Sequence, residues 1–183
     1  MFGSRLTGAR KATAAARRSL LLLAALSLLS SPLLAQSAGD ADPMQPLERL
    51  VGGAWYLGED SYQTFRWGLG RLSMVAEMFV VTPAGPQAVS EMMFAYHPGE
   101  RVVKGWGVAR QMGIDFFEYD ITVDGETLVF DLKAFGPAAE EGPLRETWTF
   151  TDADHYEWSL LSGAGDGSWE RTMSGTFERR QTP

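Results

Sequence analysis

Few residues of this 183-residue chain have the types and spacing that metal or nucleophile chemistry requires. The sequence has two histidines, His97 and His155, and no cysteine. His97 precedes Pro-Gly and His155 follows Asp152 and Asp154, so both histidines are expected at turns. A zinc site needs three or four nitrogen or sulfur ligands, and an oxygen-only calcium site at the two aspartates is less favoured than a solvated turn. We therefore predict no metal and no cofactor.

Carboxylates are the remaining candidates for catalysis, because there is no Gly-x-Ser-x-Gly motif and no thiol. Asp115 and Glu118 are three residues apart, which places them on opposite faces of a strand. Glu77 or Glu91 could lie inside a barrel and act as an acid or a base. We predict no catalytic residue and keep an acid–base enzyme, of the isomerase or cyclase type, as an alternative.

The glycine pair Gly52-Gly53 could suggest a phosphate-binding loop. Such a loop follows a strand and opens a helix, whose N–H groups face the anion. Here a short helical turn, which Pro46 favours, precedes the glycines, and a β-rich run follows them. The order is reversed, so the pair is interpreted as the passage from a helical turn into the first strand.

Short β-rich runs separated by turn residues fill the chain after Gly53. Asp124-Gly125 and Asp166-Gly167 are typical of tight hairpins, and strands joined by tight turns pair antiparallel. The sequence therefore predicts an all-β fold: an up-and-down antiparallel barrel of about ten strands with a short N-terminal helical turn, because closure removes exposed edges. A β-sandwich is the structural alternative.

Alternation along the strands assigns side chains to two faces. In the last strand it places Trp169, Arg171, Met173 and Phe177 on the inward face. Arg171 is then a candidate anchor for a carboxylate of a ligand or of the protein, unless it lies at the rim with only its stem packed. The predicted ligand wall is completed by Met74, Met78, Met92 and Phe94 of the third and fourth strands. Simple core filling is the alternative.

A helical turn followed by Gly53-x-Trp55 on the first strand of an acidic all-β chain resembles the start of the calycin barrels. This group includes lipocalins, fatty-acid-binding proteins and bacterial relatives, to which "YHPGERVVKGWG" and "RETWTFTDADHYEW" are also similar. The resemblance implies that the tryptophan plugs the closed end and packs against a basic residue late in the last strand. Of Arg171, Arg179 and Arg180, Arg179 is selected, which predicts a structural plug of Gly53, Trp55 and Arg179.

The resemblance also implies a small ligand inside the barrel. Some calycin relatives bind haem through one histidine, for which His155 would be the candidate, although its flanking acids indicate exposure. The prediction remains a barrel without a cofactor.

Residues 1–35 have the layout of a secretory signal peptide: a basic region, the apolar run "SLLLLAALSLL" and a small-residue site ending at Ala35. Arg17-Arg18 leaves both general and twin-arginine export open. Residues 36–45 are expected to be a flexible lead-in and residues 46–183 the barrel domain, located in the periplasm or outside the cell. The apolar run is too short to predict a membrane span in the mature form.

Charge disfavours two classes of partner. Five of the 16 Lys and Arg residues and none of the 23 Asp and Glu residues lie in residues 1–35, so the remainder has a formal net charge of −12. Such a chain repels nucleic acid and anionic lipid surfaces. The sequence therefore predicts a barrel that binds a small lipophilic or carboxylate ligand, with a structural or protein-interaction module of the cell envelope as the first alternative.

Overall fold

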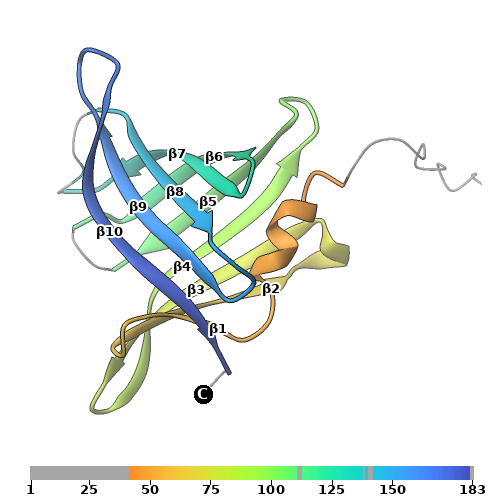
Figure 1. Cartoon of the computed structure of the whole chain (residues 1–183), viewed down its shortest axis with the longest axis vertical. Helices are drawn as coiled ribbons and strands as arrows, with labels where there is room; N and C mark the ends of the chain where they lie inside the picture. The colour runs from red at the N-terminus through yellow and green to blue at the C-terminus, as the bar shows by residue number, and fades with distance from the viewer. Residues whose placement is uncertain (1–41, 111–112, 138, 140–141, 182–183) are drawn as a thin grey trace, which may run out of the picture. The chain divides into compact units, whose positions relative to one another are not determined.

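The computed structural model describes residues 42–110, 113–137, 139 and 142–181. Within them, ten antiparallel strands close into a barrel with the order β1-β10-β9-β8-β7-β6-β5-β4-β3-β2 (Figure 1). The all-β barrel predicted from the sequence is confirmed. Its strands are β1 (Ala54–Leu57), β2 (Ser61–Trp67), β3 (Ser73–Thr82), β4 (Gly85–His97), β5 (Val102–Ala109), β6 (Phe116–Asp124), β7 (Thr127–Phe135), β8 (Leu144–Phe150), β9 (His155–Gly163) and β10 (Trp169–Arg180).

Tight connections join most of the strands. β6 ends at Asp124 and β7 begins at Thr127, so the predicted Asp-Gly hairpin forms there. In the β9–β10 connection, the Asp166 carboxylate accepts hydrogen bonds from the backbone N–H and the hydroxyl of Ser168, at 2.9 and 2.6 Å. These bonds lower the pKa of Asp166. The predicted signal peptide, residues 1–35, and residues 36–41 of the predicted lead-in lie outside the described residues.

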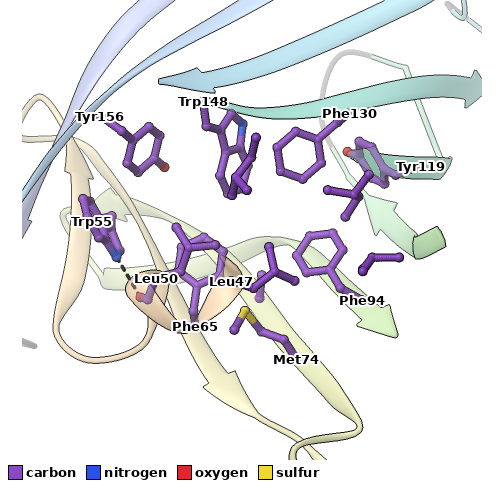
Figure 2. Close-up of a cluster of buried hydrophobic side chains, with 14 of the residues drawn as sticks. Leu47, Leu50, Trp55, Phe65, Met74, Phe94, Tyr119, Phe130, Trp148 and Tyr156 are labelled. Atoms are coloured by element: carbon purple, nitrogen blue, oxygen red, sulfur yellow. Dashed lines mark hydrogen bonds between the residues drawn. The ribbon is translucent and has the colours of Figure 1, made fainter. Parts of the chain in front are cut away.

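A short 3-10 helix, η1 (Gln45–Leu50), carries apolar side chains into one end of the barrel. Leu47 and Leu50 are 2 % and 0 % exposed, and Figure 2 shows them among the aromatic side chains of the strands. Ion pairs from Glu48 to Arg71 (3.0 Å) and from Arg49 to Glu126 (2.7 Å) also join η1 to two strand connections. Exposed pairs of this kind contribute little, so the buried leucines hold the helix in place.

The inward-facing side chains of the strands form one aromatic-rich core. Trp148 stacks on Tyr156 with ring centroids 5.3 Å apart, and Phe130 lies 4.4 Å from Trp148. Small residues make room for these rings. A Cβ added at Gly105 would lie 2.5 Å from Cδ1 of Phe94, so glycine on β5 is what permits the phenyl ring to lie across that strand.

The two ends of the barrel differ. The β2–β3, β6–β7 and β8–β9 connections lie at the end that η1 closes, because η1 or Arg179 beside it contacts each of them. Antiparallel alternation places the β1–β2, β3–β4, β5–β6, β7–β8 and β9–β10 connections at the opposite end. A second short 3-10 turn, η2 (Leu69–Arg71), lies within the β2–β3 connection.

Candidate functional site

A cavity of about 280 Å³ lies inside the barrel, toward the end away from η1. Met173 lines the cavity and is also 46 % exposed, so it lies at the mouth. The wall is mostly apolar and aromatic, which is typical of small-molecule sites. Its apolar members are Leu57, Met78, Val89, Met92, Ala109, Phe117, Trp148, Trp158, Met173 and Phe177, and its polar members are Gln63, Ser90, Tyr119 and Glu146.

The residues predicted to form a ligand wall lie partly at the cavity and partly in the core. Met78, Met92, Met173 and Phe177 line the cavity. Met74 and Phe94 have the predicted inward orientation, but both are 0 % exposed and pack within the core nearer the closed end (Figure 2). The closed end is filled by η1, a volume effect that alternation along the strands does not reveal.

The predicted inward orientation of Trp169 and Arg171 is wrong, because β10 contains a register shift between Arg171 and Met173. Met173 pairs with Leu160, whereas Arg171 pairs with Leu161, the residue of the opposite face. The Arg145 guanidinium stacks over the Trp169 ring at 4.3 Å on the outer face. Arg171 is exposed there and does not line the cavity.

The same shift turns Glu170 toward the inner face near the mouth. Glu170 pairs with Ser162, which pairs with Leu144 of the inward row of β8. An extra residue in one strand of an antiparallel pair changes the face of every residue beyond it. The bulge thus exchanges a base for an acid on the inward side of β10.

The structural plug predicted at the closed end is present. Trp55 is 0 % exposed and pairs directly with Arg179, whose guanidinium carbon lies 4.4 Å from the ring centroid of Trp55. The indole N–H donates to the carbonyl of Leu50 at 2.9 Å, as the dashed line in Figure 2 marks. Gly53 has φ of +70°, and a Cβ there would lie 2.6 Å from the carbonyl oxygen of Arg180.

Glu146 is the charged member of the cavity wall, and it was not among the residues predicted from the sequence. It lies on β8 between Leu144 and Trp148, all on the inward face, while Arg145 points outward to Asp131 at 2.6 Å. The signal was available in the alternation of "LRETWTF", which places one acid in a row of large apolar residues. The sequence-based prediction placed the polar anchor at Arg171 of the last strand instead.

Burial raises the pKa of the Glu146 carboxyl, because a charge in an apolar surrounding loses its hydration. The indole N–H groups of Trp158 and Trp148 act in the opposite direction on that pKa, and Trp148 Nε1 donates to Oε2 of Glu146 at 3.3 Å. Burial also raises the pKa values of Tyr119 and Tyr156 well above the ordinary value, and the Glu146 charge adds to this. Both phenols are therefore neutral near neutral pH.

The other candidate acids lie outside the cavity. Glu77 and Glu91 are directly opposite each other across β3 and β4, on the face opposite the lining residues Met78 and Met92. Neither can act on a molecule inside the barrel. The placement of Glu77 and Glu91 follows from the alternation that puts the neighbouring methionines inside.

Both histidines lie at strand ends near the closed end, His97 as the last residue of β4 and His155 as the first residue of β9. His155 Nδ1 is 2.9 Å from Oδ1 of Asp152, and this carboxylate raises the pKa of His155. His97 Nδ1 accepts from the backbone N–H of Glu100 at 3.1 Å. Neither histidine lines the cavity. Across the described residues, no group of three or more His, Cys, Asp or Glu side chains is arranged to hold a metal ion.

An apolar row crosses the outer face of β5, β6 and β7, where Val108 pairs with Phe116 and Phe116 with Phe135. Val108 and Phe135 are 53 % and 46 % exposed. Exposed rows of this kind mark protein contacts when they are large enough. The interaction-module alternative depends on this row.

A closed ten-strand antiparallel barrel with a plugged end and an internal cavity fits the calycin-like class of fold. In the described residues, no helix is long and apolar enough to span a membrane. Neither a family model nor a curated protein matches the chain.

Among the solved structures that are similar to this chain are the following two. One is the crystal structure of Rv2717c from M. tuberculosis, with 18 % identity, a TM-score of 0.48, and coverage of 78 % of this chain and 100 % of that one. The other is EF1p2_mFAP2b bound to DFHBI, with 15 % identity, a TM-score of 0.32, and coverage of 76 % and 100 %.

Proposed function

We propose that the barrel binds a small, partly apolar molecule in its interior cavity. The observation that carries this proposal is the space of about 280 Å³ with an aromatic and methionine wall beside a fully packed closed end. A volume at the lower end of the range for ligand sites favours a compact ligand over a long acyl chain. Methionines at the mouth and wall supply adaptable contacts.

Uptake of an uncharged fluorescent apolar dye such as N-phenyl-1-naphthylamine tests the proposal. Met78 and Met93 provide matched variants, because Met78 lines the cavity and Met93 is 45 % exposed on the outer face. Met78→Trp is expected to fill the space and to abolish uptake, whereas Met93→Trp is expected to retain it. Equal uptake by both variants, or none by the unmodified protein, would contradict the proposal.

We also propose that the protein acts outside the cytoplasm, as a bacterial exported branch of calycin-like barrels. Support comes from the basic, apolar and small-residue order of residues 1–35. The intact mass of protein recovered from its native cells tests this, since cleavage after Ala35 gives a chain beginning at Gln36. A full-length mass in the cytosolic fraction would refute export.

A second candidate function is acid–base catalysis inside the same cavity, and the raised pKa of Glu146 is the observation that favours it. A carboxyl group with a raised pKa keeps its proton to a higher pH than an ordinary glutamate, and it can donate that proton to a bound substrate. Nuclear magnetic resonance of side-chain ¹³C-labelled glutamate measures this pKa directly. A Glu146 pKa at or below the ordinary glutamate value would remove the candidate.

A further inference from the structure

We infer that the cavity selects a molecule carrying a protonated amine on an apolar body, with the amine held at Glu146. The inference concerns the charge of the ligand and rests on the proposed ligand-binding function. This charge is opposite in sign to that of the carboxylate ligand that an inward arginine would favour. Three features of the cavity carry the inference: its charges, its aromatic faces and the free hydrogen-bonding capacity of the carboxylate.

The charges of the cavity are acidic only. Glu146 lines it, and among the described residues that line it none is Lys, Arg or His. The bulge in β10 holds Arg171 on the outer face and places the exposed Glu170, which does not line the cavity, in the inward row beyond it. A carboxylate ligand would therefore meet like charge without a counter-charge, while an ammonium group would meet Glu146.

Aromatic rings surround the carboxylate. Trp148 and Trp158 are direct cross-strand partners on the inward faces of β8 and β9, and Phe117 and Tyr119 line the cavity from β6. The faces of such rings carry negative potential and attract cations, most strongly where water is excluded. Rings beside one carboxylate form a suitable surrounding for an organic ammonium ion.

Glu146 keeps the capacity to bind a donor. A carboxylate offers about four acceptor positions, and the indole N–H groups of Trp148 and Trp158 occupy only part of them. Two phenol groups face Glu146, those of Tyr119 and Tyr156. Both are neutral near neutral pH, so they do not supply a positive charge. An ammonium ligand would supply it, and would favour the ionised carboxylate that burial disfavours in the empty cavity.

Isothermal titration calorimetry with three naphthyl probes of similar size tests the inference. The probes are naphthylmethylamine, naphthylmethanol and naphthylacetate, measured near neutral pH. The amine is expected to bind at least about ten times more tightly than the carboxylate. Met78→Trp is expected to remove binding of all three probes, which places them in the cavity.

Glu146→Gln and Glu118→Gln are the matched variants, because Glu118 lies on the outer face of β6 between the lining residues Phe117 and Tyr119. Glu146→Gln retains an acceptor for Trp148, and is expected to bind naphthylmethanol as before while losing the preference for the amine. Glu118→Gln is expected to retain that preference. Alcohol binding without an amine preference in the unmodified protein would overturn the inference and leave the proposed function intact. Binding of none of the probes would overturn both.

Discussion

The guanidinium of Arg179 lies over the ring of Trp55 and joins the two strands that close the barrel, β1 and β10. Its Nη1 donates to the carbonyl of Val51 at 3.2 Å, and its Nη2 donates to the carbonyls of Arg49 and Ala153, the latter at 3.1 Å. One side chain therefore connects η1, β1 and the β8–β9 connection.

Arg179→Ala is expected to lower the free energy of unfolding by about 2–4 kcal/mol, because it removes a cation–π stack and several charge-assisted hydrogen bonds. Arg171→Ala is the control on the same strand, since Arg171 is exposed, and it is expected to change stability by less than about 0.5 kcal/mol. Urea unfolding at constant m-value measures both. Equal midpoints for the two variants would contradict the role given to Arg179.

Gly53→Ala is expected to destabilise the barrel by more than Gly58→Ala. The two glycines have nearly the same φ, +70° and +69°, so the left-handed conformation costs each alanine about 1–2 kcal/mol. Only at Gly53 would the added Cβ also meet a backbone atom, the Arg180 carbonyl oxygen at 2.6 Å, whereas nothing lies within 4 Å at Gly58. Thermal unfolding of both variants compares the two costs. An equal loss at the two positions would show that the close approach of β1 to β10 is unimportant.

Glu91→Lys is expected to stabilise the barrel by about 0.2–1 kcal/mol, because it replaces a like-charge pair with Glu77 by an opposite-charge pair. The gain should shrink at high salt, which screens exposed charges. Glu157→Lys on β9 is the control, since Thr149 and Thr176 lie opposite it rather than an acid. Denaturant midpoints at low and high salt measure the difference, and an equal gain for both variants would exclude the pair as the cause.

The empty barrel is expected to lose stability as pH rises through the range in which Glu146 titrates. The folded-state pKa of this carboxyl is raised above 4.5, its ordinary value, so between the two pKa values the native state binds more protons than the unfolded chain. Stability therefore falls as pH rises in that window and is level above it. Glu146→Gln should remove this fall, and Glu118→Gln should not. Urea midpoints across the acidic to neutral range test this, and an unchanged pH profile in Glu146→Gln would refute it.

Local patterns in the sequence were sufficient for the fold. Period-two alternation and Asp-Gly turns indicated the antiparallel barrel. The resemblance carried by Gly53-x-Trp55 implied the plug with Arg179, which the structure contains. The faces predicted for Trp169 and Arg171 were wrong, because one extra residue in β10 interrupts an alternation that looks continuous in the sequence. Nothing in the local residue types marks that interruption.

The cavity itself depends on volume and not on pattern. Met74 and Met78 share a face of β3, yet the first packs in the core and the second lines the cavity. The difference arises from how far the leucines of η1 reach into the closed end. Glu146 could have been found from alternation alone, because it occupies an inward position of β8.

The bulge in β10 also decides whether the interior contains its own counter-ion. With uninterrupted alternation, Arg171 would lie one inward position from Met173, which is in the same cross-strand row as Leu160 and Glu146, and could neutralise that acid from within. With the bulge, the positive charge that neutralises Glu146 must come from the molecule that enters the cavity. Barrels of this architecture that differ by one inserted residue at the β10 bulge should therefore differ in the sign of the charge on the ligand they bind, even where every side chain of the cavity wall is the same.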